Sequence, residues 1–301
     1  MEYIILAIAL FFLILFLFAK GFYDYKRDEK RFREHLASDY GTALKREYKP
    51  EQLLHIPRYY EKHADEHSLD DITWHDLDMD EVFKQMNYTY SSAGEEYLYY
   101  ILRNPEMTEN RLENRENIIR YFKENPTQRV QYQFIFSKLG KIKKFSIYDY
   151  LDYLDDLGEQ SNLPHYISWL LLILSIVVML FQFSVGLLCF LGVLIYNNFT
   201  YFKVKEKIEP YITSFAYIFR LMDTYERLKK YKVSALNGEF EEMAQANRVL
   251  QSFSRGSYIL MSSGRMTGSG SPLDMLFDFI RMGFHIDIVK FNQMLRVVRG
   301  S

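Results

Sequence analysis

Two long apolar stretches stand out along the chain, and both predict membrane helices. The first runs unbroken from Tyr3 to Ala19 and is followed by Lys20 and a basic cluster at positions 26–33. A cleavable signal peptide carries its positive charge before the apolar stretch, whereas here the charge comes after it and no small-residue cleavage site follows. The positive-inside rule then puts the N-terminus outside and the following region in the cytoplasm. Residues 1–20 are predicted to form a transmembrane signal anchor.

The second apolar stretch, Ile167 to Phe199, is too long for one upright span. As a single helix it would measure about 50 Å, against a hydrocarbon core of about 30 Å. Gln182 to Gly186 interrupts it, and lysines lie on both flanks, at positions 141–144 and 203–207. Two cytoplasmic flanks favour a transmembrane helical hairpin over residues 164–202. A single tilted or kinked helix is the alternative.

The remaining segments show the spacing of amphipathic helices. Residues 21–76 are predicted to form a juxtamembrane helix and a polar connector, and residues 77–163 a first set of core helices. Ser91 or Ser92 with Glu95 resembles a capping box, Pro105 ends that helix, and Thr108 can cap the next. The buried face of this next helix is predicted to hold Leu112, Ile118, Ile119 and Phe122.

Residues 203–301 are predicted to supply the second part of the helical core. Glu206 to Leu236 forms a long amphipathic helix, Gly264 to Pro272 a Gly/Ser-rich loop, and Leu273 to Val298 a further helix. No convincing strand alternation appears in the first set of core helices. The expected fold is therefore all-α: an anchor helix, a transmembrane hairpin and a cytosolic helical bundle.

The charge balance and the cysteine count exclude several classes of function. The 37 Lys and Arg nearly balance the 39 Asp and Glu, which argues against a surface that tracks nucleic acid along its whole length. The only cysteine is Cys189, so a disulfide within the chain and a zinc ribbon are both excluded.

Neither candidate catalytic motif has both the residues and the surroundings that its chemistry needs. The Gly264–Pro272 loop lacks the Gly-Lys-Ser/Thr of a phosphate-binding loop, and no apolar strand precedes it, so a flexible connector is the favoured interpretation. His63-Ala64-Asp65-Glu66-His67 matches the H-x-x-E-H zinc pattern, but Tyr59 to Asp71 is strongly polar. We interpret it as a solvated connector, with a membrane zinc peptidase as a rival hypothesis. We expect no metal site, no cofactor site and no enzymatic activity from this chain alone.

A stretch of about 30 residues resembles the helical core of the MutS mismatch-repair family. That core has a small residue and Gly, then Leu at four-residue spacing, then Pro, then a helix with an Arg followed three residues later by an apolar residue. The residues that match in order and spacing are Gly94, Leu98, Leu102, Pro105, Leu112, Arg115 and Ile118. With the hairpin, the chain is similar to the membrane-anchored MutS-like proteins of Gram-positive bacteria.

The resemblance implies a mechanical module, non-catalytic by itself, that couples to a MutS-type ATPase domain or forms a homo-oligomer. ATP and Mg²⁺ are implied only for that absent ATPase domain, and DNA as a partner by resemblance alone. The chain ends at Ser301 before any ATPase, and the hairpin lies roughly where DNA-handling relatives carry their DNA-contacting clamp. The rival hypothesis from the residues is a membrane-tethered scaffold that binds a protein partner through the apolar stripe from Ile212 to Leu228.

Overall fold

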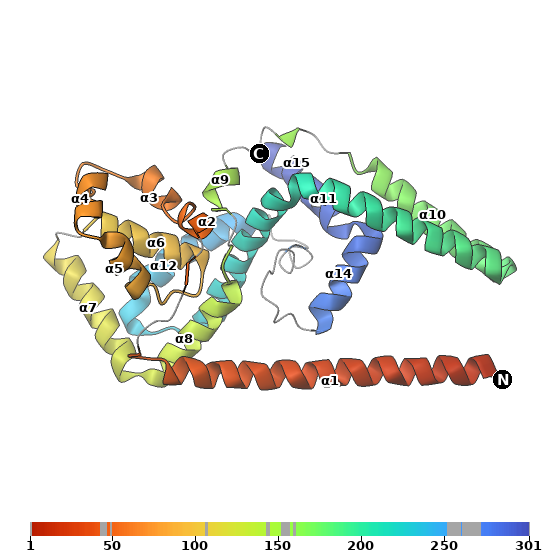
Figure 1. The fold of residues 1–301 in the computed structure, drawn as a ribbon, viewed down its shortest axis with the longest axis horizontal. Coiled ribbons are helices and arrows are strands. Elements are labelled where there is room, and N and C mark those ends of the chain that lie inside the picture. The colour runs from red at the N-terminus through yellow and green to blue at the C-terminus, as the bar shows by residue number, and fades with distance from the viewer. Residues whose placement is uncertain are drawn as a thin grey trace. The chain divides into compact units, whose positions relative to one another are not determined.

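The computed structural model describes residues 2–42, 47–48, 50–105, 108–142, 145–151, 157–158, 161–251, 260 and 272–300. Every regular element in these ranges is a helix (Figure 1), which confirms the all-α class. Contacts divide the chain into two compact units. Unit 1 comprises Met1–Glu34, Gly158–Ile212 and Tyr258–Ser301, and unit 2 comprises His35–Leu157 and Thr213–Ser257. The described residues 272–300 therefore belong to the same unit as the hairpin region.

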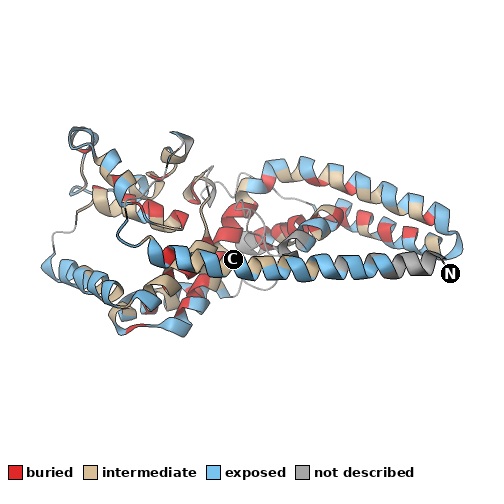
Figure 2. Cartoon of the chain, turned by 60° about the horizontal axis from the view of Figure 1, so that its bottom comes forward, coloured by how far each residue is buried: buried red, intermediate tan, exposed pale blue. Residues whose placement is uncertain are grey.

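Helix α1 (Glu2–Ser38) carries the first apolar stretch and continues without a break into the basic segment. Its apolar side chains are mostly exposed, with Phe11 62 % and Phe16 64 % accessible, as the pale blue of Figure 2 shows. Exposing such a continuous run of large apolar side chains to water is unfavourable. The run therefore indicates a non-aqueous environment or a protein partner.

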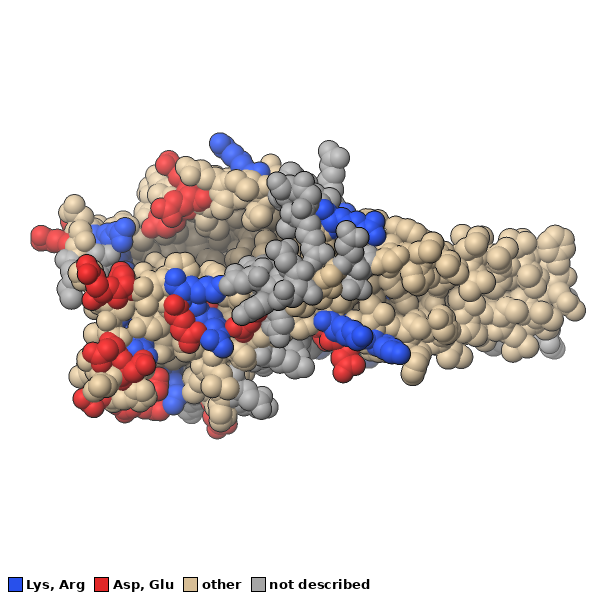
Figure 3. Space-filling view, turned by 90° about the horizontal axis from the view of Figure 1, so that it is seen from above, with Lys and Arg blue, Asp and Glu red and all other residues tan. Residues whose placement is uncertain are grey.

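The second apolar stretch folds back on itself as two antiparallel helices. Helix α10 (Leu163–Phe181) ends at Gln182, and α11 (Phe183–Leu228) returns beside it, as Figures 1 and 2 both show. One continuous helix, the alternative from the sequence, is not what the chain forms. Both helices are long and apolar enough to cross a membrane. Residues 163–202 contain no Asp, Glu, Lys or Arg, and Figure 3 shows this as a tan surface without blue or red atoms where it is coloured.

A glycine sets how closely the two helices approach after the turn. A Cβ on Gly186 would overlap the backbone N and Cα of Met179, which cannot move aside as a flexible side chain can. Small residues allow helix backbones to come this close. Gly192, two turns further along α11, faces open space.

Unit 1 is completed by α14 (Pro272–Phe284) and α15 (Ile286–Gly300). The sequence predicts one helix over Leu273 to Val298, but His285 breaks it, with a left-handed φ of 54°. The predicted Gly/Ser-rich loop lies outside the described residues, except for Pro272, which begins α14.

In the described part of the chain, unit 2 is a set of short helices packed around apolar clusters. The predicted polar connector at 21–76 contributes to one of them, since Trp74 is buried with Ile56, Phe83 and Tyr99. Its helices, apart from the end of α11, are α2 (Pro50–Leu53), α3 (Arg58–His63), α4 (Asp71–Asp76), α5 (Met79–Met86), α6 (Ser92–Arg103), α7 (Glu109–Glu124), α8 (Pro126–Leu139), α9 (Tyr148–Leu151) and α12 (Asn237–Gln251).

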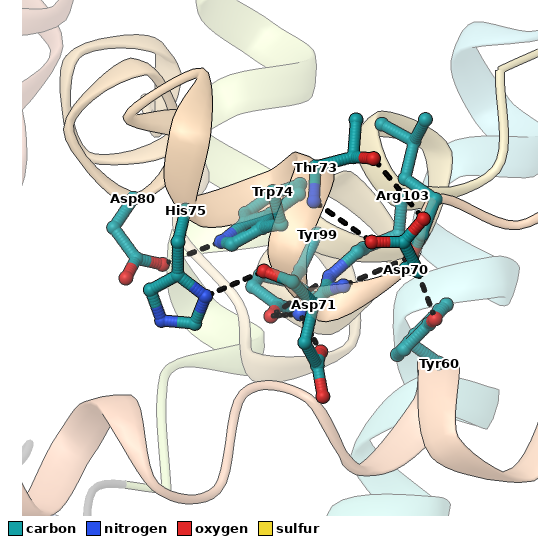
Figure 4. Close-up of polar contacts among 10 residues, drawn as sticks. Tyr60, Asp70, Asp71, Thr73, Trp74, His75, Asp80, Tyr99 and Arg103 are labelled. Atoms are coloured by element: carbon teal, nitrogen blue, oxygen red, sulfur yellow. Dashed lines mark hydrogen bonds and ion pairs between the residues drawn. The ribbon is translucent and has the colours of Figure 1, made fainter.

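The cluster around Trp74 encloses a buried arginine (Figure 4). The guanidinium of Arg103 lies 4.4 Å from the Trp74 ring centroid and 4.9 Å from that of Tyr60. It donates to the Leu69 carbonyl at 3.0 Å and to Asp71 at 2.8 Å. A buried charge is tolerated when its donors are satisfied, and here the planar guanidinium both stacks and hydrogen-bonds. Arg103 therefore ties α6 to the segment that leads into α4.

The apolar stripe of α11 faces the protein's own core. Tyr225 and Leu228 pack with Tyr132 and Ile135 of α8, and Tyr217 is fully buried in another cluster. The face that the scaffold hypothesis assigned to a partner is therefore covered within the chain.

Helix α7 differs from its prediction. Leu112 and Ile119, expected on a buried face, are 46 % and 54 % exposed, because α7 packs through other positions against α8 and the short 3-10 helix Ser234–Leu236. Phe122, by contrast, packs against the Tyr132 cluster.

We predict that Gly186→Ala destabilises the hairpin by about 1–3 kcal/mol, because the added methyl group forces the Met179 backbone away. Gly192→Ala, the matched control, is expected to be neutral or slightly stabilising. The measurement is thermal unfolding of the full chain in detergent. Equal effects of the two substitutions would contradict the close approach.

Candidate functional site: a polar junction at the open end of the hairpin

Helix α10 places its polar side chains inward and its apolar side chains outward. The buried positions His165, Ser168, Leu172 and Ser175 recur at three- and four-residue spacing on one face. Outward positions such as Leu170 and Ile173 are 57 % and 58 % exposed. This pattern is inverted relative to a helix of a water-soluble core, whose apolar face is the buried one. Only 22 % of the most apolar window of α10 is buried, so it is not a core helix either.

The facing side of α11 is polar in the same region. Asn197 and Tyr201 are 1 % and 2 % exposed, whereas Ile195 and Phe199 point outward and are 70 % and 73 % exposed. The Ser168 hydroxyl donates to the Asn197 side-chain carbonyl across the hairpin. The inward polar groups therefore satisfy one another, as hydrogen-bonding groups must when water is excluded.

A histidine pair occupies the centre of this junction. The Nδ1 atoms of His165 and His285 lie 2.9 Å apart, and Nε2 of His285 lies 2.8 Å from the backbone carbonyl of Asn197. The two side chains are 7 % and 3 % exposed. The pair joins the start of α10 to the corner between α14 and α15.

Two further side chains hold the same corner by its backbone. The Asn197 amide donates to the Gly283 carbonyl at 2.7 Å, and the Trp169 indole donates to the Phe284 carbonyl at 2.6 Å. The last carbonyls of a helix have no partner within the helix, so these bonds cap the end of α14. Aromatic residues are common at the start of a membrane helix, where they lie at the interface. In addition, Trp169 has a hydrogen-bond partner in the protein, the Phe284 carbonyl.

Polar pairs flank the histidines. The Asn292 amide donates to the Asn162 side-chain carbonyl at 2.8 Å. The Tyr201 hydroxyl donates to Asp287 at 2.8 Å and receives a hydrogen bond from Lys205 at 2.9 Å. Asp287 and Asn292 are fully or almost fully buried. These pairs connect the residue before α10, and α11, to α15 by bonds between side chains.

His285 adopts a backbone conformation that favours glycine. A left-handed φ costs a residue with a Cβ about 1 kcal/mol. Burial lowers the pKa of the His285 imidazole, while the Asn197 hydrogen bond and the Asp287 charge act to raise it. A strained, buried and titratable side chain at a corner is the kind of residue that a functional site retains.

Unit 2 contains a separate buried acid. Glu96 on α6 is 5 % exposed, and its carboxyl oxygens lie 2.9 and 3.0 Å from the Ser146 hydroxyl. Burial raises the pKa of Glu96 to about 8, and the nearby charges of Asp149 and Glu95 act in the same direction. Asp149 in turn lies 2.9 Å from Arg58 and 3.2 Å from His55. Glu96 is therefore largely protonated at neutral pH.

The MutS-like positions lie on two consecutive helices of unit 2. Leu98 and Leu102 pack against the Trp74 cluster, and α6 ends at Arg103, just before Pro105. A Cβ on Gly94 would first meet Ser91 and Thr89, so the glycine adjoins its own turn and not a second helix. Leu112 and Arg115 line a shallow groove on α7, and Ile118 is half-buried.

The zinc motif does not form a site. Helix α3 ends at His63, so His63 and His67 are not one helical turn apart on a common face. His63 stacks on Tyr59, and its Nδ1 lies 2.8 Å from the Tyr59 carbonyl. Among the described residues, no group of three or more His, Cys, Asp or Glu could hold a metal ion.

Sequence reasoning missed the junction, although part of its signal was visible. His165, Ser168 and Ser175 share one face of a helix that is otherwise apolar, and Asn197 lies in the second half of the same stretch. Nothing in the sequence, however, indicates that His285 is their partner, because the contact spans 120 positions.

Comparison with protein-family models, with curated proteins and with solved structures finds no match. The function proposed below therefore rests on the geometry of the chain and on the sequence resemblance.

We predict that Glu96→Gln raises the free energy of unfolding by about 1–3 kcal/mol at neutral pH. A raised carboxyl pKa means that the stability due to Glu96 is complete below about pH 4.5 and is lost as the pH rises towards about 8. Glutamine does not titrate, so the gain should vanish below about pH 4.5.

Unfolding of the full chain can be followed by Trp74 fluorescence in a Trp169→Phe background, since the chain has only two tryptophans. The neighbouring control is Glu95→Gln, which removes an ion pair with Lys141 (2.7 Å) and should lower stability. A gain for Glu96→Gln that is the same at every pH would show that folding does not raise the pKa of Glu96.

Proposed function

We propose that this chain is a membrane-anchored helical module that transmits movement between the bilayer and a cytosolic helical core. The hairpin of α10 and α11 inserts in the membrane, α1 is a further anchor, and unit 2 lies in the cytoplasm. The observation that carries the proposal is the inverted hairpin, whose polar side chains face inward and whose apolar side chains face outward. In a bilayer this arrangement places hydrocarbon against hydrocarbon and pairs the polar groups.

The lengths and flanking charges support insertion. The 19 residues of α10 span about 28 Å, which matches a hydrocarbon core of about 30 Å. Lys203, Lys205 and Lys207 follow the apolar part of α11, and basic residues also follow the apolar part of α1. The positive-inside rule then gives a multi-pass protein with an external N-terminus.

The mechanical role rests on the continuity of α11. This helix is 46 residues long, and it runs from the hairpin turn to Leu228 in the apolar core of unit 2. A helix keeps all its backbone hydrogen bonds internal, so it can carry a displacement along its axis without unfolding. Pro210, inside α11, removes one such bond close to the boundary between the units.

The source of the movement is proposed from the resemblance to MutS proteins. The matching residues lie on α6 and α7, two consecutive helices of unit 2, with Pro105 between them. A MutS-type ATPase, in the same polypeptide or in a partner, would supply nucleotide-driven movement with ATP and Mg²⁺. Binding of mismatched DNA is the family's activity, and for this chain it is a proposal by resemblance alone.

The coding DNA beyond the codon for Ser301 tests the coupling to an ATPase. We expect the frame to continue into an apolar strand followed by G-x-x-x-x-G-K-[ST]. The product of that frame should hydrolyse ATP, and substitution of the motif lysine by alanine should abolish hydrolysis without releasing the protein from the membrane. A stop codon directly after Ser301, with no such frame nearby, would contradict the coupling and leave a membrane scaffold.

A further inference from the structure

The positions of the hydrogen atoms in the histidine pair follow from its partners. A backbone carbonyl can only accept, so Nε2 of His285 carries a hydrogen and donates to Asn197 at 2.8 Å. A neutral His285 then has a lone pair on Nδ1. Because Nδ1 of His165 lies 2.9 Å away, that atom must carry a hydrogen and donate to it. The neutral pair therefore has one defined set of tautomers.

An added proton is disfavoured at either site. On Nδ1 of His285 it would face the hydrogen already on His165. On Nε2 of His165 it would create a cation in the first turn of α10, where the positive end of the helix dipole disfavours it. Both positions are buried, and burial disfavours any charged imidazole.

The charged groups around the pair are fixed by other partners. Asp287 on α15 faces His285, but its two oxygens already accept from the Tyr201 hydroxyl and the Ile288 amide. Arg281 on α14 pairs with Asp278. The titratable and charged groups that face the junction are Tyr201 and Lys205 of α11, Asp278 and Arg281 of α14, and Asp287 of α15.

The pair also holds the point at which α14 and α15 attach to the hairpin. His285 is the left-handed corner residue itself, and the two preceding carbonyls receive the Asn197 and Trp169 hydrogen bonds. Separation of the imidazoles would therefore pull on all three attachments at once.

We propose that His165 and His285 form a proton-sensitive latch, which closes the α14–α15 corner onto the hairpin when both imidazoles are neutral and releases it when they gain protons. The latch rests on contacts within unit 1 and does not depend on the proposed ATPase coupling. Asp287 favours a charged His285 and so partly offsets the effect of burial, which lowers the pKa of that imidazole.

Spin-label distances in the full chain, reconstituted in lipid vesicles, test the latch. Cysteines at Leu170 of α10 and Phe279 of α14, which are 57 % and 72 % exposed, carry the labels in a Cys189→Ser background. Pulsed EPR compares about pH 7.5 with about pH 4.0. The lower value lies well below the ordinary histidine pKa of about 6.5, because burial lowers the pKa of His285. We expect one short-distance population at the higher pH and a longer-distance population at the lower pH.

Two variants and one control separate titration from simple loss of a contact. His285→Asn keeps a residue that tolerates a left-handed φ, and His165→Gln keeps a polar side chain in α10. Each should give the same distances at both pH values. Asn292→Leu removes the neighbouring Asn162–Asn292 bond, which does not titrate, and should leave the pH response intact.

Two results would overturn the latch. One is a wild-type distance distribution that is unchanged between the two pH values. The other is a pH response in His165→Gln as large as that of the wild type, which would assign the titration to another group. Because His165→Gln leaves the strained corner residue in place, it tests the latch even where His285→Asn does not fold.

Discussion

The structure depends on one constraint: the polar groups between α10 and α11 have no water to bind and must satisfy one another. His165, Ser168 and Asn197 meet across the hairpin, and the last carbonyls of α14 complete their hydrogen bonds. Buried donors and acceptors without partners would cost about 1–3 kcal/mol each. The same constraint explains why the α14–α15 corner lies where it does, and why a strained histidine occupies it.

The outward face of the hairpin is apolar and needs an apolar environment. Residues such as Leu170, Ile173 and Ile195 are too numerous and too exposed for a helix in water. In unit 2 the pattern is the usual one, with Trp74, Tyr99 and Tyr132 inside. Lipid around the hairpin, as proposed, and water around unit 2 would account for both patterns. Helix α11 runs from the hairpin into unit 2 as one helix.

Much of the fold follows from the sequence because the signals are local. The break at Gln182, the end of α6 before Pro105 and the cap of α6 by Ser91 all agree with the predicted helix limits. Where a prediction depends on tertiary packing it is less successful. Leu112 and Ile119 have helical spacing but remain exposed, since no described element covers that face of α7. The sequence predicts a polar connector before residue 77, although Trp74 completes a core cluster there.

The candidate site is less predictable than the fold. In the sequence, His165 is one polar residue at the start of an apolar helix, and its partner lies 120 positions away. The helix breaks at His285, and this break creates the corner. Local helix propensity would instead predict a break at Gly283, because glycine adopts a left-handed conformation more readily than histidine. Gly283 instead lies inside α14, where its carbonyl accepts the hydrogen bond from the Asn197 amide.

The most direct test of the account is the environment of each face of α10. Single nitroxide labels at residues 168–176, in the full chain without Cys189 and in lipid vesicles, report collisions with oxygen, which partitions into lipid, and with a water-soluble nickel chelate. We predict that Leu170 and Ile173 are reached by oxygen and not by the chelate, and that Leu172 and Ser175 are reached by neither. If Leu170 and Ile173 were as accessible to the chelate as Tyr97, an exposed residue of unit 2, the hairpin would not lie in a bilayer.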